Sequence, residues 1–351
     1  MRDDPQSTRR RVYSGIQPTS VMTLGNYFGA VQSWVRLQDE HECVYCVVDL
    51  HAMTAPYDPS ELRGSTREMF VSLLAAGVDP ERSVVYVQST VPEQAELCWL
   101  LATLASLGDL SRMTQFKEKA AAQRRGGDGD GAFTPAALLF YPILQAADIL
   151  AYRADAVPVG DDQSQHLEMS RGIARRFNSR FGNFFPEPET LLTRVPRVMS
   201  TADPTRKMSK SLGPRHFIGL FEEEGSLRRK IRSAVTDSGA AEGGGISPGV
   251  DNLLTLLGAS GHPEEADRMR EEYRVGKLRY VDLKGRTADA LAALTAEMRD
   301  RRADVERRVG YVDEVVAEMG DRARSIAGET LARVRDRMGI FPPGRPPATG
   351  L

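Results

Sequence analysis

The chain has 351 residues, a net charge of −2, 41% hydrophobic residues and 27% charged residues. This length and balance are typical of a globular protein with two domains, one of which has a sizeable core. The sequence has no run of about 18 apolar residues, which argues against a membrane span. Residues 1–12 are polar and Arg-rich without an apolar stretch, so they do not form a secretory signal, and we expect a cytoplasmic protein.

The net charge does not by itself indicate a protein that binds nucleic acid. Basic residues nevertheless gather in the C-terminal third, as over 228–232 and 299–308. A local basic face is sufficient for nucleic-acid binding. Such clusters also form solvated helix faces with glutamate partners, and both interpretations stay open.

The three cysteines do not indicate a metal site. Cys43 and Cys46 lie three residues apart in an apolar, β-branched stretch. Positions three apart in a strand face opposite sides of a sheet, so the two thiols would not converge. Because Cys98 stands alone, no second pair exists to complete a zinc site. We predict that all three are small core residues and that the protein holds no metal of its own.

The N-terminal half alternates between strand and helix patterns. Strands are predicted at 11–16, 44–48, 83–88 and 154–159. Helices are predicted from about residues 25, 58, 92, 134 and 160. This β-α-β-α-β order predicts an α/β fold with a parallel sheet and crossover helices.

The other segments divide the chain further. A Gly/Asp-rich insert at 120–132 predicts a mobile surface loop, and a last short strand is expected near Val198 and Met199. Amphipathic helices follow from about residue 220. We expect a disordered extension at 1–10, an α/β domain at 11–213, a helical domain at 214–340 and a disordered Pro-rich tail at 341–351.

A first unusual motif follows the first predicted strand. It reads Ser14-Gly15-Ile16-Gln17-Pro18, and then Thr23-Leu24-Gly25-Asn26-Tyr27. A turn from strand to helix directs backbone N–H groups and the positive helix end at one spot. Gly25 has no side chain to keep a nucleotide away, and Thr23 and Asn26 offer neutral hydrogen bonds to phosphate oxygens. Alone, the pattern also fits an ordinary tight turn.

A second motif, Lys207-Met208-Ser209-Lys210-Ser211, lies far downstream. It places two ammonium groups on a loop of small residues that could close over a polyphosphate. Such groups stabilise the negative charge that builds on a departing pyrophosphate. A Lys/Ser loop is usually a solvated turn, but Met208 is an apolar residue that such a turn does not need.

Together the two motifs resemble the signatures of class I aminoacyl-tRNA synthetases, and the segments between them resemble the tryptophanyl branch. The first motif matches this branch at Gly15, Gln17, Pro18, Thr23, Gly25, Asn26, Tyr27, Gly29 and Ala30. The resemblance, from about residue 11 to 340, implies a Rossmann-like doubly wound parallel sheet followed by an all-helical anticodon-binding domain. It also implies a homodimer that uses ATP and Mg²⁺ to form tryptophanyl-adenylate from L-tryptophan and then charges tRNA(Trp).

Asp148 is the residue that we expect to determine which amino acid is recognised. It lies in a helical segment, 144–150, that is otherwise mostly apolar. A buried carboxylate is costly unless a donor meets it, and an indole N–H is such a donor. A phenylalanine ring would leave the charge unpaired and would be rejected. An internal arginine or backbone amides could also satisfy the carboxylate, but the segment resembles the family's indole-reading helix.

The resemblance implies the remaining site residues. The catalytic residues would be Thr23, Asn26, Lys207 and Lys210. ATP would be bound by Gln17, Gly25, Asn26, Lys119, Gly160, Asp162, Lys207, Met208, Ser209, Lys210 and Ser211. The amino acid would be bound by Tyr13, His51, Gln115, Tyr141, Gln145, Asp148 and Gln163.

Three of these residues leave alternatives open. Tyr13 and Gln145 are more polar than an indole pocket requires, which would suit an auxiliary copy with relaxed indole specificity. Asp148 could also accept the phenol proton of tyrosine, so a tyrosine-activating synthetase is a second alternative. A small-molecule ligase on the same scaffold and an inactive tRNA-binding paralogue are two further alternatives. The intact Lys207 and Lys210 argue against an inactive copy.

Overall fold

The computed structural model describes residues 9–114, 116, 135–159, 164–192, 197–236 and 245–341. The expected insert at 120–132, nearly all of the N-terminal extension and the tail from residue 342 lie outside these ranges. Within them, no helix combines the length and the apolar character needed to cross a membrane.

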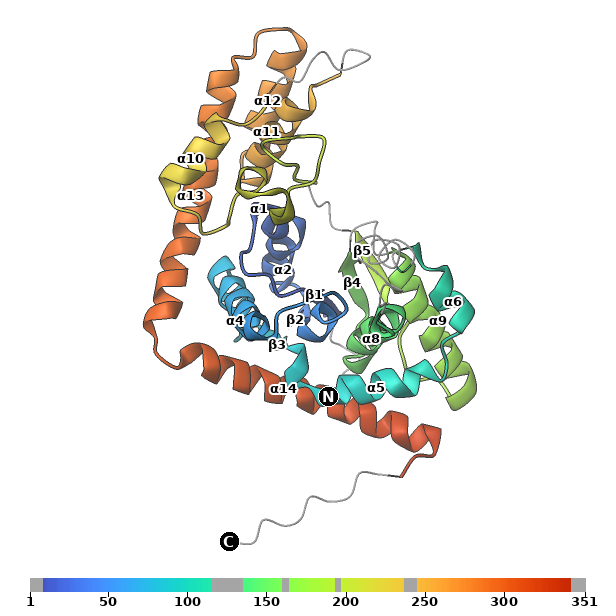
Figure 1. The fold of residues 1–351 in the computed structure, drawn as a ribbon. Coiled ribbons are helices and arrows are strands. Elements are labelled where there is room, and N and C mark those ends of the chain that lie inside the picture. Colours follow the sequence, from blue (N-terminus) through green and yellow to red (C-terminus); the bar gives the residue numbers. More distant parts are fainter. Residues whose placement is uncertain are drawn as a thin grey trace, which may run out of the picture.

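A five-stranded parallel sheet forms the centre of the N-terminal half (Figure 1). Its strands are β1 Arg11–Ile16, β2 Glu42–Val47, β3 Ser83–Val87, β4 Ala156–Val159 and β5 Glu189–Leu192. The spatial order is β3-β2-β1-β4-β5, and Val12 of β1 pairs with both Cys43 and Ala156. The order reverses between β1 and β4, which makes the sheet doubly wound and places the ligand-binding crevice beyond the carboxyl ends of these two strands. The predicted α/β, Rossmann-like class is confirmed.

The last strand is not where the sequence predicted it. Met199 makes only an isolated antiparallel bridge with Lys207, and the fifth strand is Glu189–Leu192. This edge strand has four residues, follows Pro188 and includes a glutamate. Short, partly polar edge strands lack the apolar run that marks a buried parallel strand, which explains the error.

Helices connect the strands. They are α1 Leu24–Asn26, α2 Gln32–Leu37, α3 Asp49–Ala52, α4 Pro59–Ala76, α5 Pro92–Ala102, α6 Leu107–Arg112, α8 Ala137–Ala151 and α9 Ser164–Phe181. A π-helical turn, Tyr27–Val31, joins α1 to α2, and a 3₁₀ turn, Gln88–Thr90, precedes α5. At the start of α4 the Asp58 side chain accepts a hydrogen bond from Ser60 N, and Gly77 ends the helix with φ 106°. These are the usual helix-start and helix-stop residues, and the start agrees with the predicted helix from about residue 58.

The cysteines belong to the core. Cys43 and Cys46 are buried in β2, Cys98 is partly buried against the same core, and all three are free thiols. Burial raises the pKa of Cys43 to about 11. Neutral, buried thiols of this kind behave as small hydrophobic groups, as predicted.

The C-terminal part is helical. It contains α10 Glu224–Arg232, α11 Pro248–Ala259, α12 Pro263–Arg274, α13 Tyr280–Arg307 and α14 Tyr311–Met338. Helices α10 and α11 pack on α13, and α13 also packs on α4. Helix α14 lies along β3, α5 and α8 (Figure 1). Gly310, at φ 80°, supplies the left-handed turn between the two long helices. The helical region therefore extends from the crevice side of the sheet around to its opposite side.

Candidate functional site

The first motif forms the turn between β1 and α1. Thr23 Oγ1 accepts a hydrogen bond from Asn26 N at 3.2 Å, and Asn26 Oδ1 accepts from Thr23 N and Thr23 Oγ1 at 3.0 and 2.8 Å. This reciprocal cap fixes the turn where a helix begins and backbone N–H groups point outward. No described residue accepts a hydrogen bond from Asn26 Nδ2, so this donor is available to a ligand.

The second motif lies against the first. Met208 is buried, and a Cβ placed on Gly25 would lie 3.5 Å from Met208 Cβ. Lys210 Nζ donates a hydrogen bond to Val21 O at 2.9 Å. The apolar residue that a solvated loop would not need therefore packs on the glycine of the first motif. Two segments far apart in sequence meet at the carboxyl end of the sheet.

The two lysines of the second motif have different environments. Lys207 is exposed, whereas Lys210 is half-buried at the start of a 3₁₀ turn, Lys210–Leu212. Burial lowers the pKa of Lys210, because an ammonium group loses hydration there. Ser209 Oγ and Ser211 Oγ share a hydrogen bond of 2.9 Å.

Asp148 lies in a closed polar cluster. Its side chain is 1% exposed on α8. His51 Nε2 donates to Oδ2 at 2.9 Å, and Gln88 Nε2 reaches both oxygens at 2.8 and 2.9 Å. Gln94 Nε2 donates to Oδ1 at 2.9 Å. Among the described residues no arginine reaches the carboxylate. The amides of Gln88 and Gln94 and the imidazole of His51 therefore offset most of the free-energy cost of removing it from water.

Gln88 and Gln94 were missed by the sequence analysis. Both are fully buried, and Gln94 also donates to Tyr86 Oη at 2.9 Å. Gln88 comes directly after the apolar strand β3, at the sheet edge where α/β proteins bind ligands. A polar residue at the end of an apolar strand was therefore a signal from which Gln88 could have been predicted as a site residue. Nothing in the sequence indicates that Gln94, two residues after Pro92, would turn toward α8.

Aromatic side chains surround this cluster. Tyr141 Oη shares a hydrogen bond of 2.8 Å with His166 Nε2, and its ring meets that of His51 edge-on at 6.3 Å. Tyr13 is buried and stacks on Tyr152, with ring centroids 5.8 Å apart. Burial raises the pKa of Tyr141 to about 12, so this phenol stays neutral. The structure thus brings Asp148, His51 and Tyr141 together.

The remaining predicted residues fall into two groups. Gln17 is exposed after β1, and Gln145 is half-buried on α8. In the described part of the chain neither side chain makes a hydrogen bond. The other group, Gln115, Lys119, Gly160, Asp162 and Gln163, lies outside the described residues.

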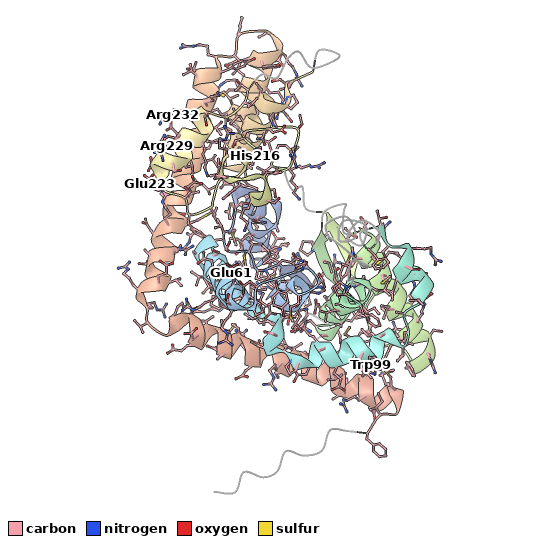
Figure 2. The ribbon with its side chains drawn as sticks, viewed as in Figure 1. Glu61, Trp99, His216, Glu223, Arg229 and Arg232 are labelled. Atoms are coloured by element: carbon pink, nitrogen blue, oxygen red, sulfur yellow. The ribbon has the colours of Figure 1, made fainter. Side chains whose placement is uncertain are left out.

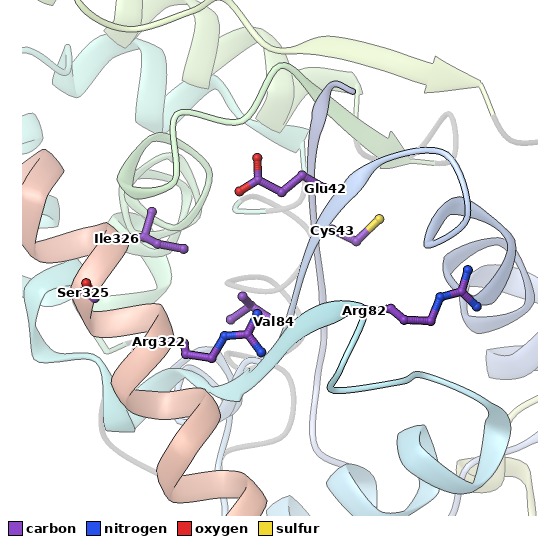
Figure 3. Close-up of a pocket in the computed structure, with 7 residues that line it drawn as sticks. All are labelled: Glu42, Cys43, Arg82, Val84, Arg322, Ser325 and Ile326. Carbon is purple, nitrogen blue, oxygen red and sulfur yellow. The ribbon is translucent and has the colours of Figure 1, made fainter. Parts of the chain in front are cut away.

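A cavity of about 270 Å³ lies at the other end of the sheet (Figure 3). Its lining includes Glu42 and Val84 of β2 and β3 and Arg322 of α14. The cations here already have partners: Arg82 pairs with Asp39, and Arg322 Nη1 donates to Pro80 O at 3.0 Å. The cavity is therefore not the predicted nucleotide site.

The chain belongs to the family of class I tRNA synthetases for tryptophan and tyrosine. The model of this family, described as class I tRNA synthetases (W and Y), matches residues 6–296. The geometry agrees with this, because both motifs converge at the switch point of a doubly wound sheet.

Relatives resemble the chain over nearly its whole length. It is 44% identical to tryptophan–tRNA ligase 2 of Streptomyces avermitilis over 96% of this chain and 98% of that protein. It is 43% identical to tryptophan–tRNA ligase of Corynebacterium glutamicum over 97% of each. Two crystal structures also resemble it. Tryptophanyl-tRNA synthetase from Mycoplasma pneumoniae has a TM-score of 0.82 and 33% identity over 95% of this chain and 98% of that one. The enzyme from Campylobacter jejuni complexed with ADP and tryptophan has a TM-score of 0.76 and 30% identity over 94% and 100%.

Proposed function

We propose that this chain is a tryptophan–tRNA ligase. It activates L-tryptophan with ATP, releases pyrophosphate, and passes the aminoacyl group from tryptophanyl-adenylate to tRNA(Trp). The observation that carries the proposal is the buried carboxylate of Asp148, held by His51, Gln88 and Gln94. His51 follows β2 and Gln88 directly follows β3, so this cluster lies at the same edge of the sheet as the first motif, which follows β1. Relatives named for tryptophan, matched over almost the full length, support the same assignment.

The amino acid would be recognised through its ring nitrogen. Ionised Asp148 has only acceptor capacity, so a donor approaching it must be an N–H or O–H group. The indole N–H is such a donor, and Tyr141 and Tyr13 supply aromatic surface for its ring. By the resemblance, Gln115, Gln145 and Gln163 would complete this side of the site.

The first step requires little covalent chemistry from the protein. The tryptophan carboxylate attacks the α-phosphorus, and pyrophosphate departs with the electrons of the broken P–O bond. The turn at Thr23, Gly25 and Asn26 would align the triphosphate, and Lys207 and Lys210 would neutralise the charge that builds on the leaving group. Gln17, Lys119, Gly160, Asp162 and Met208, with Ser209 and Ser211, would complete nucleotide binding.

Magnesium would enter on the nucleotide. The described residues include no group of three or more His, Cys, Asp or Glu side chains suited to a metal ion. Mg²⁺ usually keeps several waters and binds through substrate phosphates, so we propose MgATP as the substrate. ATP and tRNA are both available in the cytoplasm, where we place the protein.

Amino acid-dependent exchange of radiolabelled pyrophosphate into ATP tests this function. We expect exchange with tryptophan and less than about 1% of that rate with tyrosine or phenylalanine, because a site built for a donor rejects a ring that lacks it or places it elsewhere. The named relatives do not favour either a tyrosine-activating enzyme or an auxiliary copy with relaxed specificity. Equal exchange with tyrosine, or efficient use of 5-hydroxytryptophan relative to a conventional enzyme, would restore those alternatives.

We propose that residues 214–340 form the tRNA anticodon-binding domain and that two copies of the chain form a dimer. The dimer proposal is supported by large apolar side chains exposed on neighbouring helices. Trp99, which Figure 2 labels on α5, is 70% exposed, and Leu107 of α6 is 69% exposed. Both helices contact α8, which exposes Phe140. Exposed apolar patches of this kind typically mark protein interfaces.

Replacing Trp99 with glutamate is expected to convert the dimer to a monomer, because a charge at a dry interface must be desolvated without a partner. Sedimentation equilibrium measures the result. The matched control is Val281→Glu, since Val281 is 65% exposed on α13. Helix α13 lies away from α5, α6 and α8 (Figure 1). A wild-type monomer, or a Trp99→Glu variant that remains a dimer, would contradict this surface.

A further inference from the structure

Residues 217–222, here called the connector, lie between the second motif and α10. The connector pairs directly with the first motif. Leu24 N donates to Ile218 O at 2.9 Å, Leu220 N donates to Met22 O at 2.8 Å, and Thr23 forms an antiparallel bridge with Gly219. The turn proposed to bind ATP is thus one half of a small two-stranded unit, and the connector is the other half.

Two charged side chains, Lys230 of α10 and Glu222 of the connector itself, hold the connector in place. Lys230 Nζ of α10 donates to Phe217 O at 2.9 Å and to Glu222 Oε2 at 2.8 Å. The same Glu222 oxygen accepts from Gly219 N at 3.0 Å, and Ser226 Oγ donates to the other oxygen. Burial acts to raise the pKa of Glu222, but these donors outweigh burial and lower it. Glu222 is therefore ionised near neutral pH, and it joins Lys230 to the bridging residue Gly219.

The other side of the connector is held by α13. Arg299 Nη1 donates to Glu222 O at 3.3 Å, and the Arg302 guanidinium lies 4.9 Å from the centre of the Phe221 ring. Arg302 also forms a two-point ion pair with Glu68 of α4 at 2.7 and 2.9 Å. The connector is therefore fixed between the helical region and the body of the sheet domain.

Lys230 differs from the other cations of its helix. Arg229 and Arg232 are exposed (Figure 2), whereas the Lys230 side chain is 22% exposed and that of Glu222 is 15% exposed. Ion pairs on open surfaces contribute little. The Lys230–Glu222 pair is partly buried, and it also makes hydrogen bonds to two backbone groups of the connector, Phe217 O and Gly219 N. Removing either side chain would leave the charge of the other without its partner.

We propose that Lys230 is a positioning residue for ATP: with Glu222 it holds the connector in register with the first motif and thereby fixes the nucleotide-binding turn. The proposal rests on ATP use by this site, which is part of the proposed function. Lys230 does not itself touch the nucleotide. It acts through Gly219 and Ile218 on Thr23 and Leu24.

Native-state hydrogen exchange tests the structural step. In Lys230→Met the amides of Leu24 and Leu220 should exchange about tenfold faster, because the pairing opens more often. Lys277→Met is the matched control, since Lys277 is exposed and its side chain makes no hydrogen bond or ion pair with a described residue. Unchanged exchange at both amides in Lys230→Met would overturn the proposal.

Nucleotide affinity tests the functional step. Calorimetry with a non-hydrolysable ATP analogue should show about tenfold weaker binding for Lys230→Met and Glu222→Gln, with tryptophan affinity within about twofold of wild type. Lys230→Arg, which keeps the cation, should recover most of the loss. Equal losses for both ligands would indicate general destabilisation and overturn the proposal, as would unchanged nucleotide binding in both variants. These measurements need no turnover, so a wild-type protein that fails to activate tryptophan would reject the proposed function and leave this test intact.

Discussion

Replacing Asp148 with asparagine should weaken tryptophan binding by about 1.5–3 kcal/mol, the range for a hydrogen bond to a charged group, or roughly 10- to 150-fold in Kd. The variant replaces a carboxylate acceptor with a neutral amide. The amide N–H₂ also faces the donors of His51, Gln88 and Gln94, so one of these donors loses its acceptor. Isothermal titration with tryptophan measures the loss.

A tryptophan analogue with sulfur in place of the ring nitrogen provides the matched ligand. It has a similar shape but no N–H, so wild-type protein should bind it poorly because Asp148 then has no donor from the ligand. Asp148→Asn should bind the two ligands with much closer affinities. Binding of an ATP analogue and the melting temperature serve as controls for folding. If the Asp148→Asn substitution weakens the binding of tryptophan and of its analogue equally, Asp148 does not recognise the ring nitrogen.

Much of the fold could be predicted from local sequence. The strands β1 to β4 are apolar runs with turn residues at their ends, and the start and stop of α4 are marked by Asp58 and Gly77. These features depend on neighbouring residues, so a single sequence contains them. The edge strand β5 was missed because four residues beside a proline carry too little of that signal.

The site was predicted only in part, because its contacts are long-range. The sequence indicated Asp148, but not Gln94, which reaches it from another helix. It identified Met208 as unusual, but not that Met208 would pack on Gly25. Likewise, Lys230 reads as one cation in a basic run, and only the folded chain places it beside Glu222. Which residues face one another across elements depends on crossover geometry, and local pattern does not specify it.

The largest effect is expected at the second motif. Replacing Lys207 or Lys210 with methionine should each lower kcat for pyrophosphate exchange by about 10²–10³-fold, the range for removing one donor that stabilises transition-state charge. Tryptophan affinity should stay within about twofold, because the proposed site for the amino acid is at Asp148 and not at the lysines of the second motif. Lys277→Met again serves as the control for loss of one positive charge. Activity of both lysine variants within about threefold of wild type would contradict the assigned role.

The pH dependence of kcat/KM for ATP gives an independent measurement on Lys210, because this ratio reports the pKa values of the free enzyme. In the proposed role the ammonium form stabilises the leaving group, so kcat/KM should fall as the pH rises through the pKa of this lysine. Burial lowers that pKa, so the decline should begin at a lower pH than an exposed lysine would give. The ammonium donates a hydrogen bond to Val21 O, and in the proposed role it would exchange this bond for one to a phosphate oxygen of ATP. If Lys210→Met shows the same alkaline decline in kcat/KM for ATP as wild type, that decline belongs to another group, and Lys210 does not supply the charge that the proposed role requires.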